Sequence, residues 1–244
     1  MAEQQSPLEQ FEIKKIFDLE LAGFDISFTN SSLWMSIAVI ACTIFVLGGM
    51  SKASIVPGRW QSMVEMAYEF IAKMLNEAVG PEARKFFPFV FTLFMFILFV
   101  NISGMIPGSF TATSHIAVTF ALAAFVFIGI TIFGFMRNGL GYLKLFMPSG
   151  IPMAMAPFLI LIEVISYLTR PISLSVRLFA NMTAGHIMLK VIASFAVMLG
   201  PVWFFPVLFN VALTGLEFLV AVLQAYVFSM LSCIYLNDTY HVDH

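Results

Sequence analysis

The sequence predicts an all-α integral membrane protein, with about five membrane-embedded helices that include a long oblique C-terminal hairpin, and one interfacial amphipathic helix. Two observations predict this class. Of the 244 residues, 60% are hydrophobic and only 11% are charged, which is far from the balance of soluble domains. The apolar residues also form segments of about 20 residues, the length that crosses a hydrocarbon core of about 30 Å. We therefore expect the whole chain, 1–244, to be a single polytopic membrane domain.

The first half of the chain contains a tail and three ordinary spans. Residues 1–30 are acidic and mixed in composition and lack the features of a signal peptide, so we expect them to form a retained N-terminal tail. Apolar runs of spanning length occupy 33–50, 86–106 and 116–136. Each of these runs predicts one membrane helix.

Residues 59–79 have a different pattern. Apolar side chains recur at helical spacing, opposite the charged residues Glu65, Glu69, Lys73 and Glu77. The apolar stripe consists of Trp60, Met63, Val64, Ala67, Phe70, Ile71, Met74 and Leu75. An amphipathic helix of this kind lies along the membrane interface rather than crossing it.

The basic residues of the loops predict the orientation. Five Lys or Arg residues lie in 51–85 and two in 137–144, whereas 107–114 contains none. The positive-inside rule therefore places 51–85 and 137–144 on the cytoplasmic side and the N-terminus outside. Lys14 and Lys15 in the tail argue mildly against this orientation.

The last hundred residues predict two helices too long for a simple crossing. Within the segment 155–198, residues 155–195 are almost continuously helical in character, and these 41 residues at about 1.5 Å each give about 60 Å, roughly twice the hydrocarbon thickness. Gly200-Pro201 interrupts it, and a second apolar segment covers 202–236. We expect a hairpin of two long helices that lie obliquely in the membrane.

Polar residues inside the first of these helices follow a regular spacing. Glu163, Arg170 and Arg177 are seven residues apart, and Asn181 follows four residues later. Seven residues are two helical turns, so these side chains share one face. The helix therefore carries a polar stripe where burial of charge is most costly.

The second helix carries a matching stripe. Asn210, Glu217 and Gln224 repeat the seven-residue spacing. Antiparallel packing about the turn would bring Arg177 level with Gln224, and His186 level with Glu217. We therefore expect two polar pairs between the helices.

His186 and Lys190 belong to another face of the first helix. His186 is nine residues after Arg177, which at about 100° per residue places it on nearly the opposite side. Arg177 can thus face something outside the hairpin, whereas His186 and Lys190 line a separate polar path with Glu217.

The cost of ionisable groups within a span, at least about 2.5–3.5 kcal/mol, makes a functional role the default for Arg177, Glu217 and His186. Structural alternatives remain for the others. Arg170 and Lys190 are also suited to be anchors that reach the headgroups. Glu163 is also suited to be a structural partner of Arg170. Asn181 and Gln224 are also suited to join helices by hydrogen bonds.

Several functional classes are disfavoured by composition. The formal net charge of −2 provides no basic field for nucleic acid. Cys42 and Cys233 lie in separate apolar segments without the spacing of a metal site. We therefore expect no nucleic acid, no metal and no cofactor.

Four motifs carry a family resemblance that extends over nearly the whole chain. The first two motifs are PGRWQ, at the start of the amphipathic helix, and FVNISGMIPG, at the end of the second span. The other two lie in the long hairpin, where RPISLSVRLFANMTAGH is followed some thirty residues later by LEFLVAVLQAY. The chain resembles subunit a of the F-type ATP synthase membrane sector. SLSVRLFAN matches the most diagnostic segment of that family.

The resemblance implies a non-catalytic stator subunit that provides two aqueous half-channels for proton translocation to and from the rotating c-ring. It implies that Arg177 is the essential cation that faces the c-ring carboxylate, with Asn181 and Gln224 beside it. It also implies that His186, Glu217 and Glu163 line the proton paths, where we include Asn210, Lys190 and Arg170 as further candidates. The implied partners are the c-subunit ring, the b subunits of the peripheral stalk, the remaining F1Fo subunits and membrane lipid.

One pair departs from the best-known bacterial pattern of the family. Here the first long helix carries His186 and the second carries Glu217, an exchange that resembles the mitochondrial arrangement. The pair still consists of one imidazole and one carboxylate, but the exchange leaves the separate role of each residue unassigned.

Two other classes of protein remain as alternatives, a secondary transporter and the stator of another ion-driven motor. A transporter typically binds its solute between inverted repeats, and the two halves of this chain show no repeat. A different stator would offer its own carboxylate as the carrier. Because no targeting peptide is evident, we expect a multi-pass protein of a bacterial inner (plasma) membrane, and we rank a mitochondrial inner membrane second.

Overall fold

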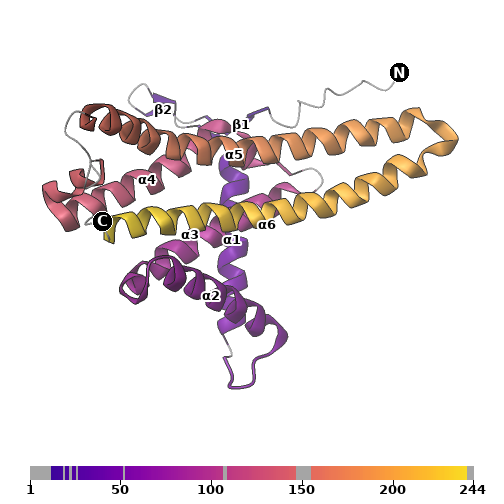
Figure 1. Cartoon of the computed structure of the whole chain (residues 1–244). Coiled ribbons are helices and arrows are strands. Elements are labelled where there is room, and N and C mark those ends of the chain that lie inside the picture. Colours follow the sequence, from indigo (N-terminus) through magenta and orange to yellow (C-terminus); the bar gives the residue numbers. More distant parts are fainter. Residues whose placement is uncertain are drawn as a thin grey trace. The chain divides into compact units, whose positions relative to one another are not determined.

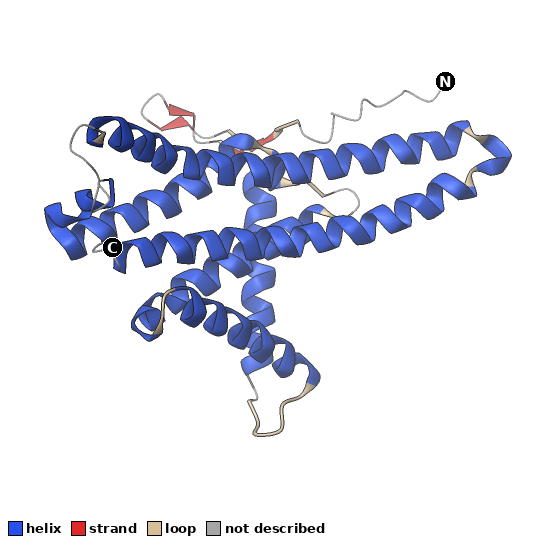
Figure 2. Cartoon of the chain, in the orientation of Figure 1, coloured by secondary structure: helices blue, strands red, loops and turns tan. Residues whose placement is uncertain are grey.

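The structure is a computed structural model that describes residues 12–18, 20–21, 24–25, 27–51, 53–106, 109–146 and 155–240. Figure 2 shows that nearly all regular structure in these residues is helical. Within this part of the chain, five helices are long and apolar enough to cross a membrane. The predicted fold class, an all-α membrane protein, is therefore confirmed.

The helices can be followed along the chain in Figure 1. Their bounds, where η denotes a 3-10 helix, are α1 Asn30–Met50, α2 Arg59–Ala78, η2 Pro81–Phe86, α3 Phe87–Gly104, η3 Ala112–Ser114, α4 Ile116–Asn138, η4 Gly139–Phe146, α5 Ala156–Met198, η5 Gly200–Val202 and α6 Phe204–Tyr240.

Two helical segments extend beyond the bounds predicted from the sequence. The second span begins at Pro81, because proline is compatible with the first turn of a helix and the charged residues after it continue as η2. The last helix, α6, reaches Tyr240 rather than residue 236. Its added turn includes Asp238, whose charge is paired with Arg170. From the sequence, residues 81–85 belong to the predicted loop 51–85, and the predicted last helix ends at residue 236.

The N-terminal segment contains short strands that the sequence did not predict. β1 (Lys15–Phe17) pairs antiparallel with β4 (Phe28–Thr29), and β2 (Glu20–Leu21) pairs with β3 (Phe24–Asp25). Several positions used in the sequence predictions lie outside the described residues, namely 1–11, 19, 22–23 and 26 of the tail, Lys52, and 107–108 and 147–154 of the loops.

The amphipathic helix α2 buries only part of its apolar stripe. Val64, Ile71 and Leu75 are buried, at the helical spacing that defines one face. In contrast, Trp60 and Phe70 are about half exposed, at 51% and 47%. The stripe is therefore wider than the face that packs against protein, and its outer part remains available to a membrane.

The chain divides into two compact units, each built from separate segments. The first contains Met1–Gly48, Met95–Val118 and Leu178–Ala225, and the second contains Gly49–Phe94, Thr119–Arg177 and Tyr226–His244. In the first unit, Ala38, Val100 and Ala112 form a small buried core. Small side chains at these positions allow the helices to approach closely.

In the second unit, the end of α6 is held by polar and aromatic contacts. The Arg137 guanidinium lies 3.6 Å from the centre of the Tyr240 ring and 3.5 Å from a carboxylate oxygen of Glu82. The Asn138 side-chain amide donates to the Thr239 carbonyl at 2.7 Å. These contacts join α6 to α4 and η2.

The two longest helices are α5, with 43 residues, and α6, with 37 residues. At about 1.5 Å per residue each is far longer than a hydrocarbon core of about 30 Å. The predicted interruption at Gly200-Pro201 coincides with η5. Gly200 adopts a φ of +56° there, in the left-handed region that glycine tolerates best.

Gly134 is a position where the fold requires the absence of a side chain. A Cβ atom at this site would lie 2.5 Å from the buried ring of Tyr142. We expect Gly134→Ala to destabilise the protein by about 1–3 kcal/mol through overpacking. The thermal midpoint in detergent measures this loss.

Gly129→Ala is the matched control, because a Cβ at this position of the same helix meets nothing within 4 Å. Alanine favours a helix over glycine, so this variant should melt at or above the wild-type temperature. Equal melting of the two variants would contradict the packing of Tyr142 against Gly134.

Candidate functional site

In the first unit, His186 is the centre of a buried polar cluster. It lies on α5, it is only 8% exposed, and its Nδ1 atom is 3.4 Å from Oε1 of Glu217 on α6, which is 6% exposed. Its Nε2 atom is 2.9 Å from the hydroxyl of Thr111. The predicted register of His186 with Glu217 is confirmed, and Thr111 is an addition that the sequence did not indicate.

The hydrogen bonds of Thr111 determine which ring nitrogen of His186 carries a hydrogen. The Thr111 hydroxyl donates to the Gly104 carbonyl at 3.2 Å. Because this hydroxyl has only one hydrogen, the Nε2–H group of His186 must donate to Thr111. In a neutral His186 the free lone pair then belongs to Nδ1, which faces Glu217. The imidazole and the carboxylate thus face each other at 3.4 Å without a hydrogen bond, close enough to pass a proton through one water molecule or a small side-chain movement.

Gly185 makes room for the Glu217 carboxylate. A Cβ atom on Gly185 would lie 2.8 Å from Glu217 Oε1, closer than van der Waals contact. Neither carboxylate oxygen has a hydrogen-bond partner among the described residues. Glu217 is therefore placed by packing against a glycine, with both oxygens left to exchange hydrogen bonds with water.

A second polar pair joins α5 and α6 in the same unit. The Asn181 amide donates to Oε1 of Gln224 at 3.1 Å. Gln224 thus pairs with Asn181, one helical turn beyond the partner predicted from the register. This is the geometry expected of hydrogen bonds that join membrane helices.

A cavity of about 80 Å³ lies between these two helices, and Asn181, Gly185 and Glu217 are among its lining residues. Its volume is sufficient for a few water molecules. Because the oxygens of Glu217 are buried without protein partners in the described part of the chain, water in this cavity is the species that would satisfy them.

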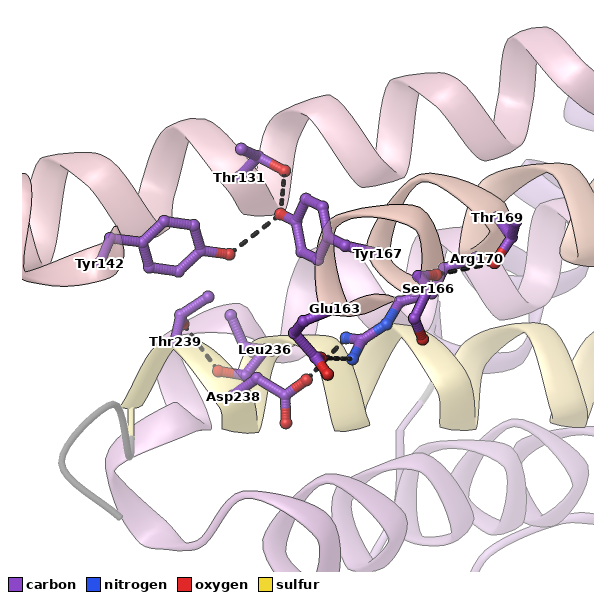
Figure 3. Close-up of polar contacts among 10 residues, drawn as sticks. All are labelled: Thr131, Tyr142, Glu163, Ser166, Tyr167, Thr169, Arg170, Leu236, Asp238 and Thr239. Carbon is purple, nitrogen blue, oxygen red and sulfur yellow. Dashed lines mark hydrogen bonds and ion pairs between the residues drawn. The ribbon is translucent and has the colours of Figure 1, made fainter. Parts of the chain in front are cut away.

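The second unit contains a separate charged cluster, drawn in Figure 3. Arg170 Nη1 lies 2.8 Å from Oδ2 of Asp238, and Nη2 lies 3.8 Å from Oε1 of Glu163. The guanidinium also lies 5.1 Å from the ring centre of Tyr235 and 5.5 Å from that of Tyr167. Two carboxylates share one guanidinium, which leaves the group with an excess negative charge.

Hydroxyl groups beside this cluster form a directed chain (Figure 3). Thr131 donates to the Phe127 carbonyl at 2.7 Å, so the Tyr167 hydroxyl, 2.6 Å away, donates to Thr131. The Tyr142 hydroxyl, 3.0 Å from that of Tyr167, is then the donor to Tyr167. This chain fixes the ring of Tyr167 beside Arg170.

Arg177 differs from Arg170 in having an exposed side chain on α5. Among the described residues it has no hydrogen-bond or ion-pair partner. His186 is buried on the same helix, which fits the prediction that the two residues serve different surroundings. A charged side chain on the outer surface of an apolar helix is suited to a partner outside the chain.

The remaining candidates are less closely connected to the clusters. Asn210 is half-buried, and its side-chain oxygen has no hydrogen-bond partner in the described part of the chain. Lys190 is half-buried and lies one turn after His186 on α5. In the residues that the structure describes, no group of His, Cys, Asp and Glu is placed to hold a metal ion.

Sequence reasoning missed Asp238 and Thr111 for different reasons. Asp238 continues the seven-residue spacing of Glu217 and Gln224 after one apolar position, so the repeat contained a signal for it. Thr111 lies 75 residues from His186, in a loop without a local pattern. Only tertiary contacts reveal it.

The register of α5 and α6 in the first unit predicts a pattern of crosslinks. With Cys42 and Cys233 replaced by alanine, Asn181→Cys and Gln224→Cys should be joined efficiently by a short bifunctional thiol reagent, because their side chains are 3.1 Å apart. Gel mobility after proteolysis between the helices measures the yield. Asn181→Cys with Gly215→Cys is the control, and equal yields for both pairs would contradict the register.

Comparisons with known proteins give a consistent result. The family model described as ATP synthase A chain matches residues 32–237. A protein named ATP synthase subunit a from Pelagibacter ubique (strain HTCC1062) is 53% identical over 242 residues, which cover 98% of this chain and 99% of that protein.

Two further relatives have the same name. The protein from Parvibaculum lavamentivorans is 54% identical over 245 residues, covering 98% of this chain and 94% of the relative. The protein from Rhodospirillum rubrum is 54% identical over 234 residues, covering 96% and 97%. With the family model matched across almost all of its helices, this chain belongs to the ATP synthase subunit a family.

Proposed function

We propose that this chain is the stator subunit of an F-type ATP synthase, and that it passes protons to and from a rotating ring of c subunits. The observation that carries the proposal is Arg177, an exposed arginine in the middle of a long apolar helix, with no hydrogen-bond or ion-pair partner among the described residues. Such a charge is costly in a membrane unless another protein supplies the counter-charge. A carboxylate on a passing c subunit is a partner of the required sign.

Arg177 would control the proton on that carboxylate. In contact with lipid a carboxyl group holds its proton, because desolvation disfavours the charged form, whereas beside a fixed cation the ionised form is favoured. Each rotor site would therefore release its proton as it reaches Arg177. Arginine does not release its own proton under these conditions, so it also blocks a direct leak between two half-channels.

The first half-channel would include Glu217, His186 and Thr111. The supporting geometry is the imidazole between a carboxylate and a hydroxyl, at 3.4 Å and 2.9 Å, beside a cavity with room for water. A proton bound at the Glu217 and His186 pair belongs to both groups. Asn181, Gln224, Asn210 and Lys190 would be the polar groups that accompany this path.

The second half-channel would include Glu163, Arg170 and Asp238. Their excess negative charge attracts protons, and the partly exposed side chains of Glu163 and Asp238, at 33% and 28%, remain accessible. The contact of Glu163 with Arg170 also fits the structural alternative raised by the sequence. Both roles are compatible, because an arginine that positions two carboxylates also keeps them from repelling each other.

The chain is a subunit of the F1Fo complex and a membrane protein, as its family membership implies. We further propose that its direct partners are the c-ring, the b subunits of the peripheral stalk and membrane lipid, and that its membrane is a bacterial inner membrane. It would perform no bond chemistry itself, since ATP is made elsewhere in the complex.

Arg177→Ala should abolish proton pumping driven by ATP hydrolysis, because the rotor carboxylate then lacks its fixed counter-charge. Arg177→Lys should fail largely as well, since a lysine can lose its proton in an apolar setting. Fluorescence quenching in inverted membrane vesicles measures pumping, with subunit content as the control for assembly. Near-normal gradients in Arg177→Ala would refute the proposed role.

Gly185→Ala should reduce pumping by about tenfold, because the added methyl group would displace the carboxylate of Glu217, at an overpacking cost of about 1–3 kcal/mol. The nearest atom to the added methyl group is the mobile end of that side chain, so assembly should change little. Gly215→Ala, whose Cβ meets nothing within 4 Å, is the matched control on α6. Equal pumping by the two variants would show that the position of Glu217 does not matter.

A further inference from the structure

A cavity of about 560 Å³ lies in the second unit, and none of its described lining residues belongs to either polar cluster described above. It is formed by the C-terminal half of α2, the turn after it, η2 and the first residues of α3. Its volume is in the range of small-molecule sites. The proton paths proposed above make no use of it.

The charged residues of this cavity are both cationic. Lys73 on α2 and Arg84 on η2 line it, together with the polar side chains of Asn76 and Tyr68, and none of its described lining residues is acidic. Lys73 has an ion pair with Glu77, but at 3.9 Å and with side chains 78% and 66% exposed this contact contributes little. Both cations are thus able to turn toward a bound anion.

Part of the cavity lining is apolar. Phe87 and Pro88, the first residues of α3, line it, and the Tyr68 ring lies 4.4 Å from the Phe87 ring, centre to centre. From this point α3 continues as a membrane span that begins at Pro81. The lining of the cavity therefore combines cationic groups with apolar residues at the start of a candidate membrane span.

The amphipathic helix α2 indicates the depth at which this cavity lies in the membrane. This helix is amphipathic, and its apolar side chains Trp60 and Phe70 remain about half exposed, as expected for a helix in the interface. A cavity at the junction of such a helix with a span lies at the level of lipid headgroups. Aromatic rings such as Tyr68 are common at this level.

We propose that this cavity binds the headgroup of an anionic phospholipid. Lys73 and Arg84 contact the phosphate, Asn76 and Tyr68 donate hydrogen bonds to its oxygens or to the polar headgroup, and the acyl chains follow Phe87 and Pro88 along α3. Basic pockets on the cytoplasmic side of membrane helices bind anionic headgroups in this way. The apolar part of the lining favours a lipid over free phosphate, because free phosphate has no apolar group to contact it.

Photolabelling of the assembled synthase complex tests the proposal. The complex is placed in phosphatidylcholine nanodiscs that contain a minor share of photoactivatable phosphatidylglycerol, and labelled peptides are mapped by mass spectrometry. We expect labelling of the segment 68–88, with competition by unlabelled phosphatidylglycerol and none by phosphatidylcholine. Inorganic phosphate in millimolar excess should not compete.

Substitution of the two cationic residues makes the photolabelling test quantitative. Lys73→Gln and Arg84→Gln should each weaken labelling by about fivefold, as expected for the loss of one cation near the membrane surface. Arg59→Gln is the matched control, because Arg59 is an exposed cation at the start of the same helix and outside the cavity. Subunit content of each complex is the control for assembly.

Three outcomes would overturn the proposal. The first is equal labelling of the cavity variants and Arg59→Gln. The second is displacement of the label by inorganic phosphate, which would assign the site to a soluble anion. The third is crosslinking of segment 68–88 only to another protein subunit, which would assign the cavity to a protein partner. None of these results would bear on the role of Arg177, so the two proposals fail separately.

Discussion

A guanidinium in an apolar helix needs a counter-charge, and α5 meets this requirement in two different ways. Arg170 finds its counter-charge within the chain, from Asp238 at 2.8 Å and Glu163 at 3.8 Å, with two tyrosine rings nearby. Arg177, seven residues later, is exposed and has no such partner among the described residues. Because an uncompensated charge in a span is costly, the first arginine stabilises the fold and the second implies an external partner.

Two threonines orient the polar groups that surround these helices. The Thr111 hydroxyl donates to the Gly104 carbonyl, so that His186 donates to Thr111 and presents its other nitrogen to Glu217. Thr131 donates to the Phe127 carbonyl in the same way, which makes Tyr167 its donor. In both units a backbone carbonyl thus determines the direction of a chain of side-chain hydrogen bonds. Such direction matters in a low-dielectric setting, where an unpaired polar group is expensive.

Glycine provides the space in which these groups meet. Gly185 lies against the carboxylate of Glu217, Gly104 against Thr111, and Gly134 against Tyr142, with hypothetical Cβ distances of 2.8, 2.7 and 2.5 Å. Each of these glycines thus lies against a residue with a functional or structural polar side chain. Small residues in membrane helices therefore do more here than bring backbones together, since they also determine where hydroxyl and carboxyl groups lie.

The sequence by itself determined the fold class, because the length and hydropathy of the spans require only local information. The seven-residue spacing of Glu163, Arg170 and Arg177 also predicted a shared face, and the interruption at Gly200-Pro201 predicted the register of His186 with Glu217. These features follow from helical periodicity and from the cost of charge in lipid. The ends of helices were less predictable, since Asp238 lies beyond the predicted end of the last helix and only its ion pair with Arg170 explains why the helix continues.

Only the tertiary structure decided which polar groups meet. It paired Gln224 with Asn181, gave Arg170 the partner Asp238, and brought Thr111 to His186 across 75 residues of sequence. It also showed that part of the apolar stripe of α2 stays exposed beside a cationic cavity. Periodicity tells which side chains share a face of one helix, but the contacts between helices depend on their mutual rotation and approach, which packing alone sets.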